Sequence, residues 1–153
     1  MKTVRRLLSV IVVLALVLGA YVLVRLQPWA QVDVPPADAS PQQVVLAYTQ
    51  AESAHDLGTM HEISEDDALV PSWIDVLLMR GPRFTDITVD EPRRHDTQGT
   101  RAEDWRQATF VPVEMTVTKG SDGGFSDGRQ QWGYVLVRNA DDEPWRIIDQ
   151  GAV

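Results

Sequence analysis

The sequence of 153 residues predicts an α+β protein in which helices pack on an antiparallel sheet, behind one membrane-spanning helix. Three observations support this prediction. An unbroken apolar stretch occupies residues 7–24. Apolar residues then recur at helical spacing through the first half of the chain. After Gly81 the spacing changes to every second residue, which is typical of strands.

The apolar stretch Leu7–Val24 carries no charge, and as a helix it would span about 27 Å, close to the hydrocarbon thickness of a bilayer. Basic residues precede it, Arg25 ends it, and the next basic residue is Arg80. Because basic residues favour the cytoplasmic side, we expect a cytoplasmic tail at 1–6 and a single-pass transmembrane signal anchor at 7–25. The remainder is then predicted to lie outside the cytoplasm, at the cell membrane.

The alternative to an anchor is a signal peptide that is cleaved. A cleaved segment has a shorter apolar region and ends in a small residue, one further residue and a second small residue. Ala20 is preceded two positions earlier by Leu18, and Ala30 by Pro28, so neither offers a good cleavage site. An uncleaved anchor is therefore favoured, and both alternatives place the domain outside the cytoplasm.

Composition argues against several classes of function. The chain has no cysteine, which excludes disulfides, thiolate metal sites and cysteine nucleophiles. The formal net charge of −8 argues against general nucleic-acid binding, because neutralising phosphates requires clustered Lys and Arg.

Residues 26–40 contain three prolines and are predicted to form an extended, semi-rigid linker before a domain at 41–153. Ser40, Pro41 and Gln43 supply an N-cap, a first-turn proline and a capping-box partner for the first domain helix. The apolar face of that helix consists of Val44, Val45, Ala47, Tyr48 and Ala51.

Two shorter helices are expected next. The first covers Leu57–Ile63, where apolar residues share one face. The second covers Pro71–Arg80 and ends at Gly81 and Pro82. Its apolar stripe consists of Trp73, Ile74, Leu77 and Leu78, and Val76 and Met79 widen it, so we expect this helix to be well buried.

Four strands are predicted after Gly81, at residues 84–90, 108–118, 130–137 and 145–149. The second has the clearest alternation, with one face formed by Thr109, Val111, Val113, Met115 and Val117. Pro112 lacks a backbone donor, so this strand is expected to lie at an edge of the sheet or to carry a bulge. The links at 119–128 and 139–144 are rich in turn residues, as hairpin connections are.

Two sequence stretches carry a resemblance to a known family. They are AHDLGTMHEI at 54–63 and WGYVLVRNADDEPWRIIDQGAV at 132–153. Together with the order of the elements, they resemble the NTF2-like (cystatin-like) superfamily over residues 41–153. The resemblance implies that N-terminal helices pack into a strongly curved antiparallel sheet and form a cone. The layout of one anchor and such a domain is also similar to that of actinobacterial envelope proteins, Mce-associated membrane proteins and inner-membrane scaffold subunits of conjugation and type IV secretion machines.

The histidines do not form a metal-binding pattern. His55 and His61 are six residues apart, so they lie on different faces of a helix and cannot act as an HExxH pair. We interpret them as solvated or capping residues and expect no metal and no cofactor.

Enzymes of the NTF2-like family place acid–base groups inside the cone, so the resemblance raises an enzymatic alternative. The residues that could face inward are Tyr48, Asp86, Glu114, Tyr134 and Asp149. An inward carboxylate in an apolar pocket would have a raised pKa and could act as a base. The competing interpretation, which we favour, is that these five residues lie on the rim or the outer face.

The sequence offers three candidate ligand-binding residues, Tyr48, Trp105 and Tyr134, and no catalytic constellation. Trp105 lies in a polar stretch, which suggests the mouth of a pocket or a partner surface. The sequence thus predicts a non-catalytic, membrane-anchored module of the cell envelope that binds a partner protein or a small apolar ligand. The alternatives are an isomerase- or dehydratase-type enzyme and a scaffold subunit of a secretion or transport complex. The oligomeric state is left open.

Overall fold

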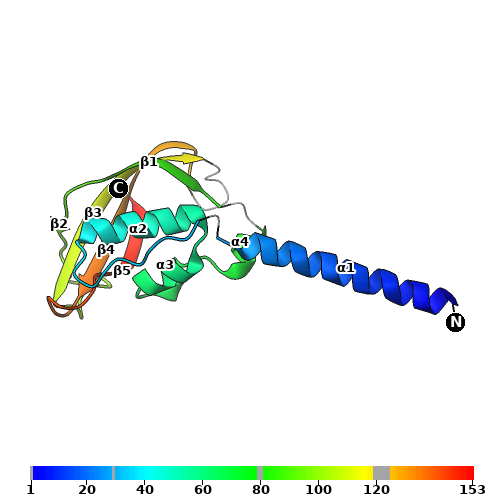
Figure 1. Ribbon diagram of the computed structural model, residues 1–153. Helices are drawn as coiled ribbons and strands as arrows, with labels where there is room; N and C mark the ends of the chain where they lie inside the picture. The colour runs from blue at the N-terminus through cyan, green and yellow to red at the C-terminus, as the bar shows by residue number, and fades with distance from the viewer. Residues whose placement is uncertain (1, 29, 79–80, 119–124) are drawn as a thin grey trace.

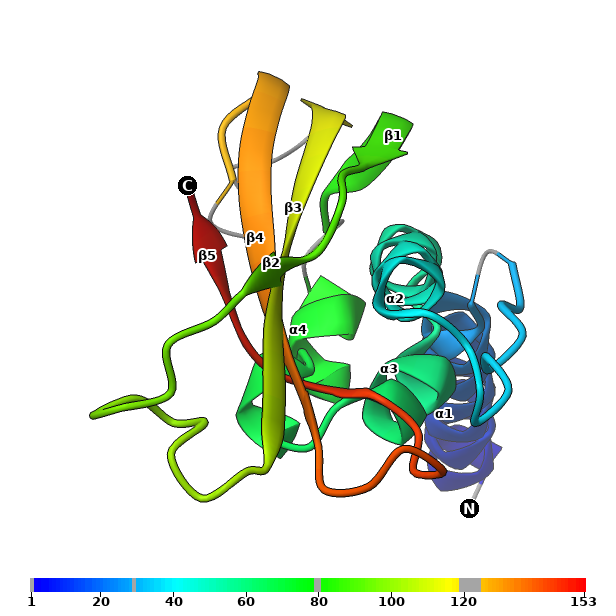
Figure 2. The same cartoon turned by 90° about the vertical axis from the view of Figure 1, so that its left-hand side faces the viewer.

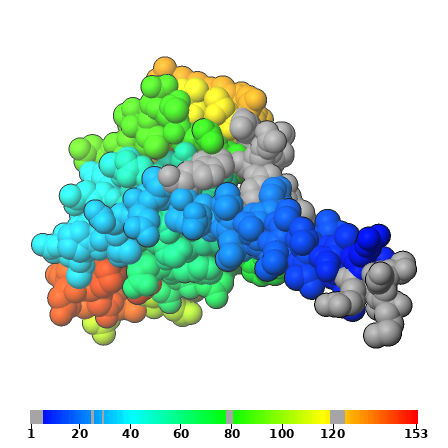
Figure 3. Space-filling model, turned by 45° about the vertical axis from the view of Figure 1, so that its right-hand side comes forward, coloured from blue at the N-terminus to red at the C-terminus, as the bar shows by residue number. Residues whose placement is uncertain are grey.

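The computed structural model shows an α+β domain from which one long N-terminal helix projects (Figure 1). It describes residues 2–28, 30–78, 81–118 and 125–153. The projecting helix, α1, covers Lys2–Leu26 and so contains the whole predicted membrane segment. Seen in space-filling form, it extends away from the domain as a separate rod (Figure 3). The predicted N-terminal apolar helix is therefore confirmed.

The domain elements follow the predicted order of helices and then strands. The helices are α2 (Pro41–Ala54), α3 (Leu57–Ile63), the 3-10 turn η1 (Asp67–Leu69) and α4 (Trp73–Leu78). The strands are β1 (Arg83–Val89), β2 (Arg93–Arg94), β3 (Gln107–Thr118), β4 (Gly128–Arg138) and β5 (Arg146–Ala152). Six residues of the predicted hairpin link at 119–128 and the end of the predicted third helix at 79–80 lie outside the described residues.

The strands form one open antiparallel sheet in the order β1-β3-β4-β5, with the short β2 pairing to β3 beyond the end of β1. Helices α2 and α3 lie on one side of this sheet (Figure 2), which we call the inner face. The β3–β4 ladder runs without a register shift from Gln107 opposite Arg138 to Val117 opposite Gly128. The predicted α+β class is confirmed; a closed cone stays a prediction.

The main core lies between the helices and the inner face. The predicted face of the clearest strand is confirmed, since Val111, Val113, Met115 and Val117 are at most 1% exposed. Helix α2 begins as predicted, with Ser40 and Gln43 forming both hydrogen bonds of a capping box. Its residues Val44, Val45, Ala47, Tyr48 and Ala51 are all buried. The 3.6-residue spacing therefore located the buried face of α2 correctly.

The outer face of the sheet is also covered, by the long connection between β2 and β3. Ala102 from this connection is buried against Val135, Val137 and Ile148 of the sheet, and Trp105 packs beside them. A second, smaller apolar cluster therefore lies on the side of the sheet that the helices leave open.

Pro112 does not mark an edge strand, so the edge alternative is wrong. The irregularity that the other alternative places here lies on the partner side, where the step from Val89 to Arg93 is one residue longer than the opposing step on β3. Strand β3 lies in the interior of the sheet, and its pairing to β4 is regular at Pro112, which stands opposite Gly133. The Pro112 carbonyl accepts a hydrogen bond from Asp90 N at 2.9 Å, just after β1 ends and before β2 begins. The side of β3 on which proline lacks a donor thus faces the break between β1 and β2, where no ladder partner is lost.

The second half of the linker is bound to the domain. Val32 N donates to Asp56 Oδ2 at 3.0 Å, and the Val32 carbonyl accepts from Thr59 Oγ1 at 2.7 Å. The Val32 side chain packs against the main core, and Ala39 is buried in it. The chain therefore has little free length between the end of α1 and the domain surface.

Helix α4 differs from the prediction in burial. It covers Trp73–Leu78, and Val76 is buried. Trp73 and Ile74, however, are 56% and 45% exposed, so the expectation that this helix is well buried is wrong. Two residues of the predicted stripe are thus exposed and Leu77 is half-buried, whereas the buried residue, Val76, was expected only to widen the stripe.

Candidate functional site

Two of the three predicted binding residues meet inside the domain. Tyr48 lies on the buried face of α2, and Tyr134 lies on the inner face of β4; both are 0% exposed. Their ring centroids are 5.7 Å apart with an interplanar angle of 68°, which is a favourable edge-on arrangement. Strand β5 places Gln150 directly opposite Tyr134. A helix and two neighbouring strands thus bring polar side chains together in the core.

The Tyr48 hydroxyl links α2 to the segment after α3. It donates a hydrogen bond to the carbonyl oxygen of Leu69 at 2.8 Å. Burial, and secondly the charge of Glu52, raise the pKa of Tyr48, and the nearby Ser64 and Gln150 offset only part of this increase. Burial likewise raises the pKa of Tyr134 well above its ordinary value. Both phenols therefore stay neutral. Tyr48 donates to Leu69, whereas the Tyr134 hydroxyl has no hydrogen-bond partner among the described residues.

Glu52 is the acidic member of this site. It lies one helical turn after Tyr48 on α2 and is buried. Burial raises its pKa from the ordinary 4.5 to about 8, because the charged form loses its hydration. Among the described residues, its Oε2 atom has no hydrogen-bond partner. At neutral pH this carboxyl is therefore mostly protonated and can donate a proton or a hydrogen bond.

We call this group of side chains the inner polar cluster. Its members share burial between α2, the segment after α3, and strands β4 and β5; they are Tyr48, Thr49, Glu52, Ser64, Tyr134 and Gln150. On the same face of β4, Trp132 also keeps its indole Nε1 buried without a partner among the described residues. Buried polar atoms that lack partners are rare in native proteins, and they mark places where water or a ligand completes the hydrogen bonding.

The carboxylates considered from the sequence lie elsewhere. Asp86 is exposed at an irregularity of β1, where its φ is 51°. Glu114 pairs with Arg129, whose hydrogen bond lowers the pKa of Glu114. Asp149 is exposed on β5. The interpretation as rim or outer-face groups is confirmed for these three and is wrong for Tyr48 and Tyr134, which lie in the main core. The buried carboxyl, Glu52, was missed.

A signal for Glu52 was present in the sequence. Glu52 follows Tyr48 by four positions and Thr49 by three, so it continues the buried face of α2. The spacing would have shown that it points toward the sheet.

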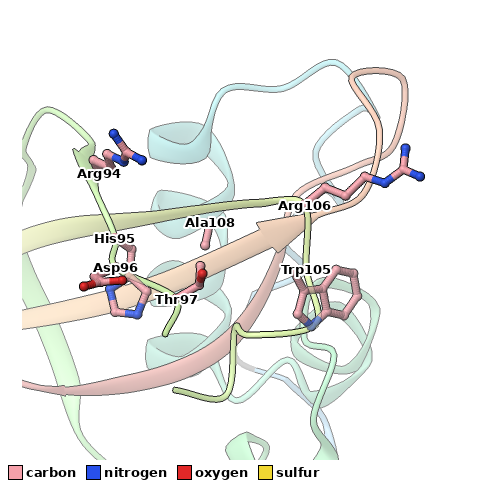
Figure 4. Close-up of a pocket in the computed structure, with 7 residues that line it drawn as sticks. All are labelled: Arg94, His95, Asp96, Thr97, Trp105, Arg106 and Ala108. Carbon is pink, nitrogen blue, oxygen red and sulfur yellow. The ribbon is translucent and has the colours of Figure 1, made fainter. Parts of the chain in front are cut away.

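Trp105, the third predicted binding residue, lies on the outer face of the sheet, away from the inner polar cluster. It lines a pocket of about 480 Å³ together with His95, Thr97 and Ala108 (Figure 4). It also lines a second pocket of about 300 Å³ that includes Arg138. In Figure 4 the side chains of Arg94 and Arg106 extend to opposite sides of the larger pocket, so their charges do not converge on one point.

The histidines have structural roles. His55 caps the end of α2 with a left-handed backbone, and both of its ring nitrogens are buried. Burial, together with the charge of Arg83, lowers its pKa, so the ring is neutral. His61 is exposed and lies 3.2 Å from Asp67. Within the described residues, no cluster of His, Asp and Glu could hold a metal ion.

No family model, curated protein or solved structure matches this chain. The resemblance to the NTF2-like superfamily therefore remains a prediction. The function has to be argued from the geometry of α1, the domain and the inner polar cluster.

Proposed function

We propose that this protein is a membrane-anchored module of the cell envelope. Its domain, held outside the cytoplasm, binds a partner protein or a small apolar ligand. The observation that supports the anchor is the segment Arg6–Val24 of α1. It has 19 residues and a mean hydropathy of 3.0, and none of its residues is buried. A helix that is apolar on all sides and uncovered by its own protein is suited to lipid.

Charge supports the orientation of this anchor. Basic residues lie before the apolar segment and at its end, whereas residues 26–79 contain nine acidic residues and no basic residue. The excess of positive charge on the N-terminal side favours retention of that end in the cytoplasm. The domain then lies on the other side of the membrane.

The inner polar cluster supports a ligand-binding role for the domain. It combines two neutral phenols and a protonated carboxyl inside an apolar core, and Glu52 Oε2 has no partner among the described residues. Because Tyr48 and Tyr134 are 0% exposed, a ligand has to enter by opening the packing between α2 and the sheet. A small and largely apolar molecule with one or two hydrogen-bonding atoms would then satisfy these groups. A strongly anionic molecule would not, since the cluster offers no basic side chain among its members.

Fractionation of cells tests the anchor. We expect the uncleaved 17.1 kDa chain to stay with the membranes after extraction at alkaline pH. Arginines at the centre of the span, as in the double variant L14R/V17R, should release the chain into the soluble fraction, because each costs about 2.5–3.5 kcal/mol on insertion. The matched control Val34→Arg, at an exposed position on the linker, should remain in the membrane. A shortened, soluble wild-type product would contradict the proposal and indicate a cleaved signal peptide.

Native mass spectrometry of the purified chain tests ligand binding. We expect wild-type protein to carry a bound small molecule that is absent under denaturing conditions. Glu52→Leu and Tyr134→Phe should reduce its occupancy, because each removes a hydrogen-bonding group of the cluster. Glu114→Gln, on the outer face, is the control and should leave occupancy unchanged. Equal occupancy in all four proteins would place the ligand elsewhere.

Acid–base catalysis is a second candidate function, and the burial of Glu52 favours it. A carboxyl with a pKa near 8 can give up and accept a proton near neutral pH, and the neighbouring phenols could stabilise a developing negative charge on oxygen. We would test it by following deuterium exchange next to the carbonyl of small ketones in D₂O. Exchange that is catalysed by the wild type and lost in Glu52→Gln would support catalysis; equal rates would exclude it for these substrates.

A further inference from the structure

We propose that α4 forms a second contact with the membrane, in which Trp73 and Ile74 lie in the headgroup region of the bilayer beside the end of α1. This inference rests on the proposed membrane anchor. It adds to that proposal a specific surface of the domain, formed by Trp73 and Ile74, that contacts lipid.

The first observation is the exposure of Trp73 and Ile74. Outside α1, the exposed large apolar side chains of the described residues are Val34, Trp73, Ile74 and Val153. Trp73 and Ile74 are the only adjacent pair among these four, and they form the first turn of α4. Trp73 alone leaves 56% of its surface uncovered, although a residue of this size is mostly buried in soluble domains.

The second observation is the location of this pair. Helix α4 contacts α1, and Figure 1 shows it where α1 meets the domain. The apolar part of α1 ends at Val24 and the helix itself ends at Leu26. If α1 crosses the bilayer, the part of the domain that touches its C-terminal end lies at the level of the lipid headgroups.

The linker holds the domain in this position. Only a short stretch separates Leu26 from Val32, whose backbone is hydrogen bonded to both Asp56 and Thr59. The domain therefore cannot move far from the membrane surface once α1 is inserted. This tether favours lipid over a soluble partner as the occupant of the Trp73–Ile74 surface.

The residues at the N-terminus of α4 are of types that suit the headgroup region of a bilayer. Tryptophan combines a large apolar ring with an N–H donor, and it is enriched where lipid chains meet water. The residue before the helix is already paired, because Asp75 Oδ2 accepts hydrogen bonds from Ser72 N at 3.2 Å and from Ser72 Oγ at 2.7 Å. Inserting the Trp73 side chain to headgroup depth would therefore leave no backbone donor of Ser72 unpaired.

Spin labelling of the full chain in phosphatidylcholine liposomes tests the proposal. Because the chain has no cysteine, single substitutions can be labelled without background. Ile74→Cys reports on the α4 surface, and Ala15→Cys reports on the middle of the span. Val153→Cys is the control, since it is exposed and lies at the end of the domain far from α1 (Figure 1). Collision with O₂, which concentrates in lipid, is compared with collision with a water-soluble nickel chelate.

We expect the label at position 74 to collide more with O₂ than with the nickel chelate, to a smaller degree than the label at position 15. The label at position 153 should show the opposite preference. If position 74 behaves like position 153 while position 15 is in lipid, the α4 contact is wrong and the anchor stands. If position 15 is itself open to the nickel chelate, the anchor fails and the α4 contact fails with it. Shielding of position 74 from both reagents, with spin–spin broadening, would indicate a second copy of the chain and contradict the proposal.

Discussion

Helices α2 and α4 have the same kind of N-terminal cap but differ in how much of their apolar surface is buried. Each starts at a serine that exchanges hydrogen bonds with the residue three positions later, Gln43 in α2 and Asp75 in α4. Helix α2 buries its apolar face almost completely under the sheet, whereas α4 leaves Trp73 and Ile74 exposed. An apolar stripe at helical spacing therefore predicts an apolar face, but it does not say whether the rest of the domain covers that face.

The largest difference between the two helices should be the effect of their acidic residues on how the free energy of unfolding depends on pH. Glu52 on α2 is buried, and its pKa is raised from 4.5 to about 8. A raised pKa means that the folded state binds a proton that the unfolded state has already released. The contribution of Glu52 to the free energy of unfolding is therefore most favourable below about pH 4.5. It falls as the pH rises toward 8, by up to about 5 kcal/mol.

Urea unfolding in detergent at pH 5.5 and pH 8.5 measures this effect. Glu52→Gln should remove most of the loss between the two pH values, because the amide has no charge to bury. Asp75→Asn on α4 is the matched control and should leave the pH dependence of the wild type intact. A pH dependence that is the same in Glu52→Gln and wild type would show that the Glu52 carboxyl reaches water.

Truncating one aromatic residue on each helix should give the next largest difference. Tyr48→Ala removes a 0% exposed ring and should lower the free energy of unfolding by about 3–5 kcal/mol. Trp73→Ala removes a larger side chain that is 56% exposed and should cost less than about 1 kcal/mol in detergent. Thermal unfolding followed by circular dichroism measures both. Similar losses would mean that Trp73 packs in the core.

The smallest effect should come from the helix caps. Ser40→Ala removes the acceptor of the Gln43 N–H and should cost about 1 kcal/mol, since α2 carries much of the core. Ser72→Ala should lower the free energy of unfolding by only about a few tenths of a kcal/mol, because the short α4 is less tightly packed. Equal costs, measured in the same unfolding experiments, would contradict the difference between the two helices.

Local signals in the sequence predicted much of the fold. The capping box at Ser40, the bounds Leu57–Ile63 and the alternation in β3 depend on residues close together in the chain, and all three are confirmed. Tyr48 and Tyr134 were both predicted as candidate binding residues, but the contact between them was not predicted. Their contact depends on how α2 packs on β4, which no local pattern specifies.

The errors arose where the outcome depends on partners distant in sequence. Pro112 was assigned to an edge because the break between β1 and β2 beside it could not be seen. Helix α4 was expected to be buried because hydrophobicity alone does not show which apolar side chains the rest of the fold covers. Glu52 was overlooked because a buried acid is rare unless its pKa shifts, and that shift is caused by the packed sheet.

The central claim is that α1 crosses a membrane and holds the domain outside the cytoplasm. Labelling single cysteines in intact cells or spheroplasts with a membrane-impermeant maleimide tests it most directly, with Thr3→Cys before the span and Val153→Cys at the other end of the chain. We predict that position 153 reacts in intact cells and position 3 only after lysis, both on the uncleaved chain. Protection of position 153 until the cells are broken would contradict the account.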